Sequence, residues 1–203
     1  DICAFIAEPI ICNLGVIVPP KSFFEQVCNA CKETDTLFIA DEVATGFGRT
    51  GKMFAFEHFG IEPDIITIAK GFSSGYTPIA ATIAKKNISE SMRFDFSNYS
   101  TYGWHPLSVE CAISNIEYLK KNNLVEKSKK SGNYLMQRLS EFCEPEGKGL
   151  CVGFDIKNQN IEQDCLNDGL IITTLYDRAS LFPSLDIGEK EIDKAVDIIR
   201  NNF

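Results

Sequence analysis

Two carboxylates and one lysine stand where apolar segments end, a placement that suggests catalytic chemistry. Asp41 and Glu42 follow one apolar run, and Lys70 follows another. Side chains alternate between the two faces of a strand, so Asp41 shares a face with Ile39 whereas Glu42 points away. Open α/β sheets bind their ligands at the carboxyl ends of parallel strands. A lysine at such an end, between apolar residues and a Gly/Ser loop, can be desolvated enough to act as a nucleophilic amine.

The glycine-rich segment GFGRTGK, residues 46–52, offers a competing interpretation, because it is one residue short of a nucleotide-binding P-loop. A working P-loop has Ser or Thr after its lysine to hold Mg²⁺, and it joins a strand directly to the N-terminus of a helix. Here Met53 follows Lys52, and two carboxylates separate the strand from the glycines. The missing hydroxyl and the nearby negative charge argue against binding of a nucleoside triphosphate.

The composition is that of an ordinary globular protein without a surplus of positive charge. Hydrophobic residues make up 44% and charged residues 24%, and the net charge is −8. Nucleic acids and anionic membranes attract an excess of Lys and Arg, so neither is an expected partner. No run approaches the roughly 20 apolar residues of a membrane span, and no secretion signal is visible, so we expect a cytoplasmic protein. Because the sequence enters directly into an apolar strand, we also expect it to be part of a longer polypeptide.

The cysteines and histidines do not form a recognisable metal or redox motif. Cys28 and Cys31 are the only cysteine pair with metal-ligand spacing, and neither a second pair nor a nearby histidine accompanies them. They share one helical stripe with Phe24 and Val27, which favours packing in a core. We expect reduced thiols, no bound metal, and a structural role for His58.

Apolar periodicity predicts an α/β fold in two parts, with a mostly parallel sheet in the first. Strands are expected at residues 2–7, 37–40, 65–69, 79–84, 150–156 and 170–174, with a further extended segment at 181–185. Helices are expected at residues 21–33, 106–119, 126–142, 161–167 and around 192–199. The first strand, helix and second strand follow in βαβ order. We place a domain boundary near residue 125, which separates residues 1–125 from a small α/β unit at 126–203.

Taken together, these segments resemble the class III family of pyridoxal-phosphate-dependent aminotransferases, the fold-type I group. The matching stretches are FIAEP (5–9), ADEVATGFGRTGKMFAFEHFGIEPDIITIAKG (40–71), STYGWHP (100–106), GKGLCVGFDI (147–156) and EIDKAVDII (191–199). They extend over essentially the whole chain, and the spacing from the Asp41 block to Lys70 is highly specific. The resemblance implies that residues 1–125 are the C-terminal part of the large cofactor-binding domain and that 126–203 are the small C-terminal domain.

The resemblance also implies a role for each matching residue. Lys70 would hold pyridoxal 5′-phosphate as a Schiff base and, once displaced by substrate, move a proton between the substrate carbon and the cofactor. Asp41 would pair with the pyridine nitrogen and favour a protonated ring, which is an electron sink. Val43 would pack on the ring face, and Thr101 would reach a phosphate in a partner subunit's site, which implies a homodimer. Glu8 would take part at the cofactor site through structural hydrogen bonds.

Two departures from the family pattern concern how a substrate carboxylate is held. Many relatives carry Gln-Gly-Glu where this chain has Ile-Cys-Asn at 11–13, and Arg where it has Ser180. In those relatives the Arg grips a substrate carboxylate and the Glu can shield it. We expect this clamp to be absent or rebuilt from Arg178, which would share a strand face with residue 180. Trp104 takes a position that is more often Gly and is a second candidate for substrate contact.

The implied activity is transfer of an amino group from an amine or amino acid, often a terminal amine in this family, to a keto acid such as pyruvate or 2-oxoglutarate. An aminomutase, racemase or decarboxylase of the same fold is an alternative that would need no second keto substrate. A non-catalytic fragment or assembly subunit is disfavoured, because Asp41, Lys70 and Thr101 have no evident packing purpose. Relatives supply a phosphate loop and a ring-stacking aromatic from an N-terminal half outside these residues. We therefore expect residues 1–203 alone to be inactive.

Overall fold

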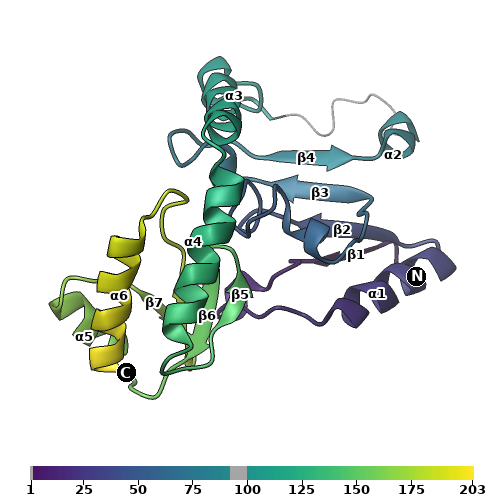
Figure 1. Cartoon of the computed structure of the whole chain (residues 1–203). Coiled ribbons are helices and arrows are strands. Elements are labelled where there is room, and N and C mark those ends of the chain that lie inside the picture. The colour runs from purple at the N-terminus through teal and green to yellow at the C-terminus, as the bar shows by residue number, and fades with distance from the viewer. Residues whose placement is uncertain (1, 92–99) are drawn as a thin grey trace.

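The computed structural model describes residues 2–91 and 100–203, which form two four-stranded sheets connected by two long helices (Figure 1). The first sheet contains, in spatial order, β1 (Ala4–Ala7), β2 (Leu37–Asp41), β3 (Ile65–Ile68) and β4 (Ala81–Ala84). The second has the order β5 (Glu146–Lys148), β6 (Cys151–Asp155), β8 (Arg178–Leu181) and β7 (Thr173–Leu175). The helices are α1 (Lys21–Glu33), α2 (Lys86–Ser91), α3 (Pro106–Lys121), α4 (Leu124–Leu139), α5 (Ile161–Asn167) and α6 (Glu189–Asn202).

The first sheet is mostly parallel, as the sequence predicted. β1, α1 and β2 form the expected βαβ unit, and β3 adds a third parallel strand with Asp41 opposite Thr67. β4 runs antiparallel to β3. A parallel return needs a crossover of about a dozen residues or more, usually an α-helix. The connection at residues 69–80 contains only the short 3₁₀ helix η3 (Lys70–Phe72), which fits the antiparallel return of the chain.

One face of this sheet is covered by α1 and the other is open. Phe24 of α1 is fully buried and packs against Phe38 of β2, with their ring centroids 6.1 Å apart. On the opposite face, which carries Asp41, none of the described strand residues is fully buried, and Ile6 is 57% exposed. The described elements therefore bury only one side of the first sheet.

The second sheet has its own core. Helices α4 and α6 pack on it through buried apolar residues, among them Leu135, Leu139, Phe154, Val196 and Ile199. The edge strand β5, which contains only three residues, was not predicted from the sequence, and the extended segment predicted at 181–185 lies at 178–181 instead. No described helix has the length and hydropathy required to cross a lipid bilayer.

The two sheets meet where glycines allow backbones to touch. A Cβ on Gly132 of α4 would lie 2.0 Å from the carbonyl oxygen of Gly149, and one on Gly149 would lie 2.5 Å from the amide nitrogen of Gly51. The carbonyl oxygen of Arg49 accepts hydrogen bonds from the amide of Leu150 (2.9 Å) and from the hydroxyl of Ser128 on α4 (3.1 Å). Only residues without a side chain permit this approach.

We expect the substitution Gly132→Ala to destabilise the protein by about 1–3 kcal/mol, because the new methyl group would meet backbone atoms that have nowhere to move. Helix propensity alone predicts the opposite sign, since Ala is favoured over Gly inside a helix by about 1 kcal/mol. Urea unfolding of the full-length protein would measure the difference. Lys130→Ala is the control, because Lys130 lies two residues before Gly132 and is exposed on α4. A Gly132→Ala protein more stable than the native one would contradict the close contact.

Candidate active site

Three of the residues singled out from the sequence lie at one edge of the first sheet. Glu8 follows β1, Asp41 ends β2, and Lys70 lies two residues beyond β3. Since these three strands are parallel, their carboxyl ends share that edge. This is the position at which open α/β sheets bind ligands.

The loop that carries Lys70 is held in a strained conformation. Lys70 has φ of +40°, in the left-handed region that residues with a side chain avoid at a cost on the order of 1–3 kcal/mol. Asn115 of α3 donates from its side-chain amide to the carbonyl oxygens of Gly71 (2.8 Å) and Phe72 (3.1 Å). The Phe72 ring stacks on Phe47 with centroids 5.3 Å apart. These contacts fix the backbone that presents the Lys70 side chain.

Lys70 lines a cavity of about 780 Å³ whose walls come from both parts of the chain. The glycine-rich loop contributes Arg49, the turn after β1 contributes Cys12 and Asn13, and the segment after β8 contributes Asp186. The volume lies within the roughly 300–1,000 Å³ of small-molecule sites. The cavity therefore offers an exposed amine, a guanidinium, a carboxylate and neutral polar groups to one small ligand.

Asp41 is held by one of its two carboxylate oxygens. Its Oδ1 accepts hydrogen bonds from the amide of Val43 (3.0 Å) and from the hydroxyl of Thr67 (3.3 Å). Within the described residues, Oδ2 makes no hydrogen bond, and Asp41 is not among the residues that line the cavity of Lys70. Thr67 was missed by sequence analysis, although the parallel register of two adjacent strands would have suggested it.

Thr101 and Trp104 are exposed in the turn before α3 and do not line the cavity. Trp104 is 86% exposed. Neither residue has a structural role within the described part of the chain that would explain its position.

Glu8 serves as a hydrogen-bond acceptor in the turn after β1. Its Oε2 accepts the amide of Cys12 at 2.6 Å, and its Oε1 accepts the side-chain amide of Asn13. Both oxygens of this carboxylate are therefore engaged. The arrangement favours the structural role that was expected for Glu8 and fixes two residues of the cavity wall.

Glu42 is a fully buried carboxylate beside Asp41. Its Oε2 accepts the hydroxyl of Thr45 (2.6 Å) and its Oε1 accepts the amide of Phe56 (2.8 Å). Burial raises the pKa of Glu42, and the hydrogen bonds from Thr45, Ala55 and Phe56 only partly offset that rise. Sequence analysis placed Glu42 on the face opposite Asp41 without foreseeing that it anchors the glycine-rich loop.

The glycine-rich loop does not have the architecture of a P-loop. Lys52 is exposed, and the element that follows it is the short 3₁₀ helix η2 (Ala55–His58) rather than an α-helix. Arg49 within the loop donates from Nη1 to the carbonyl oxygens of Leu150 and Pro183, and burial lowers the pKa of its guanidinium. In the sequence, the position of Arg49 between Gly48 and Gly51 was the feature that could have indicated this structural role.

The side chains that could bind metal do not converge in the described residues. No group of three or more His, Cys, Asp or Glu residues has metal-binding geometry there. His58 contacts the carbonyl oxygen (3.0 Å) and the hydroxyl (3.2 Å) of Thr50, and burial lowers its pKa. Cys28 and Cys31 are free thiols on α1 whose pKa values are raised by burial.

Arg178 makes hydrogen bonds both within its own sheet and to the first part of the chain. Its guanidinium donates to Asp155 (2.6 Å) and Glu146 (3.2 Å) and to the carbonyl oxygens of Gly15 (3.0 Å) and Val16 (3.2 Å). It does not line the cavity. This geometry favours a structural role for Arg178 over the carboxylate clamp that the sequence suggested.

We expect Arg178→Ala to lower the free energy of unfolding by roughly 1–3 kcal/mol, because it breaks four hydrogen bonds, three of them part-buried. The keto-acid KM of the full-length protein should stay within about twofold of the native value, since a residue outside the cavity has no substrate contact to lose. Urea unfolding and steady-state kinetics would measure both quantities. A large rise in KM with unchanged stability would restore the substrate role.

The raised pKa of Glu42 predicts how Glu42→Gln alters stability with pH. Because the pKa of Glu42 is higher in the folded than in the unfolded protein, protonation of Glu42 favours the folded state. This contribution to stability is complete below the unfolded-state pKa and is lost as the pH rises through the folded-state pKa. Glutamine keeps an acceptor for Phe56 and can donate to Thr45, but it does not ionise. The stability of Glu42→Gln relative to native should therefore increase from about pH 4 to pH 8 in thermal melts. A constant difference would mean that the pKa of Glu42 is not raised.

The whole chain, residues 1–203, matches the family model described as aminotransferase class-III. It is 38% identical over 204 residues to acetylornithine aminotransferase of Archaeoglobus fulgidus, which covers 99% of this chain and 54% of that protein. It is 36% identical over 212 residues to ornithine aminotransferase of Plasmodium falciparum, covering 98% of this chain and 51% of that protein.

The fold also matches a solved structure of an S-selective transaminase from Arthrobacter sp., with a TM-score of 0.92 and 32% identity over 98% of this chain and 50% of that one. The chain thus spans about half the length of these proteins. The match extends through both sheets and includes the strand ends that carry Asp41 and Lys70. The chain therefore belongs to the class III aminotransferase family.

Proposed function

We propose that the protein containing this chain is a pyridoxal-phosphate-dependent aminotransferase that moves an amino group from an amine or amino acid to a keto acid. The observation that carries the proposal is Lys70, an exposed amine on a strained loop that is fixed by α3 and lines a cavity of about 780 Å³. Family membership supplies the reaction class. When bound, pyridoxal phosphate supplies an electron sink and a temporary carrier for the amino group.

The residues present fit this cofactor in two respects. Lys70 Nζ would hold the cofactor through its aldehyde carbon, and in its free form the same nitrogen would accept the proton that leaves the amine-bearing carbon of the donor. Asp41 would bind the ring nitrogen through Oδ2, because Val43 and Thr67 already occupy Oδ1 and thereby fix the carboxylate plane. A carboxylate in that place favours a protonated ring nitrogen.

The cavity suits a substrate with charges of both signs. Arg49 offers a guanidinium whose only described partners are backbone carbonyls, and Asp186 offers a carboxylate on the opposite part of the chain. Two of the similar proteins are named for ornithine and acetylornithine, which are amino acids. We therefore propose an amino acid donor, with a terminal amine as the transferred group, and pyruvate or 2-oxoglutarate as acceptor.

A second copy of the chain is the proposed partner, in a homodimer with shared active sites. Large apolar side chains of the loop after Lys70, of the turn before α3 and of α3 itself lack cover from the described residues: Tyr76, Tyr102, Trp104, Leu107 and Tyr118 are 58–86% exposed. Exposed apolar groups that cluster in this way mark interaction surfaces. Thr101 lies among them and would contribute its hydroxyl to a phosphate in the neighbouring site.

A domain boundary near residue 125 and a cytoplasmic location complete the proposal. Helix α4 begins at Leu124 and packs in the core of the second sheet, whereas Leu119 of α3 packs with residues of the first part. Asn123 between the helices has φ of +53°, which turns the chain sharply. All eight cysteines are free, which suits a reducing compartment.

We expect Lys70→Gln in the full-length protein to reduce kcat by roughly 10³-fold or more, because the amine that binds the cofactor and moves the proton is removed. The native protein should show the visible absorption of the bound cofactor, and borohydride should fix the cofactor covalently to the peptide that contains Lys70. Neither signal should appear in the variant. Donors such as ornithine, with pyruvate and 2-oxoglutarate, are the substrates to screen.

Lys52→Ala is the matched control, since Lys52 is an exposed lysine of the neighbouring glycine-rich loop. Its activity should stay within about twofold of the native protein. Turnover that requires no keto acid would favour an aminomutase, racemase or decarboxylase instead. Native protein that binds no pyridoxal phosphate would end the proposal.

A further inference from the structure

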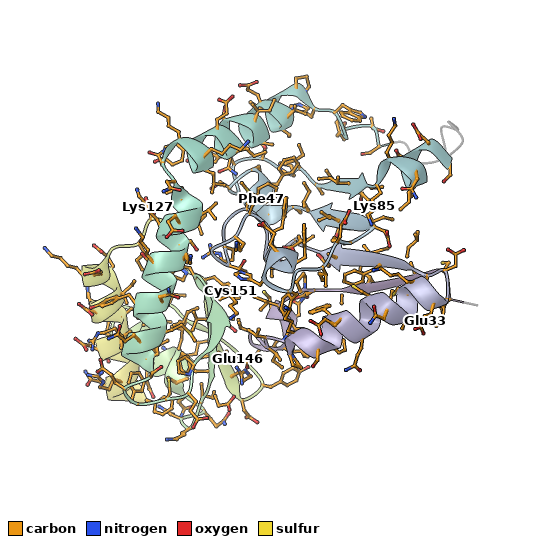
Figure 2. All side chains as sticks on the ribbon, turned by 45° about the vertical axis from the view of Figure 1, so that its right-hand side comes forward. Glu33, Phe47, Lys85, Lys127, Glu146 and Cys151 are labelled. Atoms are coloured by element: carbon orange, nitrogen blue, oxygen red, sulfur yellow. The ribbon has the colours of Figure 1, made fainter. Side chains whose placement is uncertain are left out.

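Two cysteines from the two parts of the chain lie in contact. Cys12 begins the 3₁₀ helix η1 (Cys12–Leu14) after β1, and Cys151 begins β6 of the second sheet. Their sulfur atoms are 3.6 Å apart, although 139 positions separate them in the sequence. Cys151 lies where the second sheet meets the elements of the first part (Figure 2). Both residues are free thiols in this structure.

We propose that Cys12 and Cys151 form an oxidative modification site, at which a peroxide of the hydrogen peroxide class converts the two thiols to a disulfide that joins the two parts of the chain. The inference does not depend on the proposed function, because it concerns only the sulfur atoms and the backbone that carries them. It also lies outside the set of residues that would hold the cofactor.

The reaction is balanced in two steps. The Cys12 thiolate attacks one oxygen of hydrogen peroxide, so that an S–O bond forms, the O–O bond breaks, and hydroxide leaves and becomes water. The resulting sulfenic acid is then attacked by the sulfur of Cys151. An S–S bond forms, the S–O bond breaks, and a second water leaves with the thiol proton. The two sulfurs together lose two electrons, and the peroxide is reduced to two waters.

The surroundings decide which sulfur reacts first. Cys12 is half-buried and lines the cavity of about 780 Å³, so that a small oxidant can reach its sulfur. Cys151 is fully buried, and its contact with Cys12 together with burial raises its pKa well above the ordinary value. Cys12 is therefore the thiol that reacts first with peroxide. Cys151 is the resolving thiol, and its sulfur is already in contact with that of Cys12.

The backbone segments that carry the two cysteines are in contact close to the pair. A disulfide requires about 2.05 Å between sulfurs, so the two must approach by roughly 1.5 Å. A Cβ on Gly153 would lie 2.1 Å from the carbonyl oxygen of Gly15, which shows that the turn after β1 rests directly on β6. Arg178 of β8 binds the carbonyl oxygens of Gly15 and Val16. These contacts hold together the turn that follows Cys12 and the strand that Cys151 begins, so the two sulfurs stay in contact.

The disulfide would close a long loop and change one wall of the cavity. A bond between positions so far apart restricts the unfolded chain strongly, so the oxidised protein should be more resistant to unfolding. Cys12 and Asn13 both line the cavity that contains Lys70. Movement of the Cys12 sulfur towards Cys151 therefore couples the oxidation state of the pair to the shape of that cavity.

Treatment of the full-length protein with hydrogen peroxide, followed by alkylation of the remaining thiols and peptide mapping without reduction, tests the proposal. We expect one cross-linked pair of peptides that contains Cys12 and Cys151 and is two hydrogens lighter than the sum of the free peptides. The apparent Tm should rise by about 5 °C or more on oxidation and return with dithiothreitol. Cys12→Ser should abolish both effects, whereas the matched control Cys28→Ser should keep them.

Three results would overturn the proposal. The first is a native protein in which both cysteines remain alkylatable after peroxide has oxidised other thiols. The second is Cys12 found as sulfinic acid while Cys151 stays free. The third is a rise in Tm that persists in Cys12→Ser. If Cys151→Ser fails to fold because its buried site accepts a hydroxyl poorly, the peptide map of native protein and the Cys12→Ser variant still decide the outcome.

Discussion

The parallel pairing of β2 with β3 is the constraint on which the rest of the site depends. It sets Asp41 opposite Thr67 and, two residues beyond the end of β3, places Lys70 at the same edge of the sheet. A shift of one residue would turn Asp41 to the face covered by α1 and separate it from the hydroxyl that binds it. The buried Phe38 and Ala40 prevent that shift, because they would then face the open side. Packing of one face therefore determines the chemistry presented on the other.

The cavity depends equally on the junction between the two parts. Arg49 binds carbonyl groups beyond β5 and β8, Arg178 binds the turn after β1, and glycines allow the backbones to touch. Residues from both parts line the cavity, so a relative movement of the two sheets would change its walls. Arg178, the charged substrate candidate of the sequence analysis, thus serves together with Arg49 to hold the walls in place. Their burial makes each hydrogen bond costly to lose.

The open face of the first sheet and the exposed aromatic side chains are two features that the described residues leave uncovered. The chain spans about half of the class III aminotransferases that it matches. Ile6 is 57% exposed and Trp104 86% exposed, values that are unusual for large apolar residues beside a ligand site. Asp41 lies on the same open face, with Oδ2 unbound among the described residues. This face of the first sheet and the exposed aromatic side chains are thus left uncovered by the residues that the structure describes.

The sequence by itself determined the local elements and the family. Helices α1 and α5 were predicted with their observed bounds, and β2 and β3 nearly so, because periodicity and flanking Pro and Asn residues are local signals. The spacing from Asp41 to Lys70 indicated the reaction class. Tertiary structure alone decided the antiparallel direction of β4, the network of Arg178 and the contact of Cys12 with Cys151. The cysteine contact and the bonds of Arg178 to Gly15 and Val16 join residues more than 100 positions apart, and only packing of the two sheets brings such residues together.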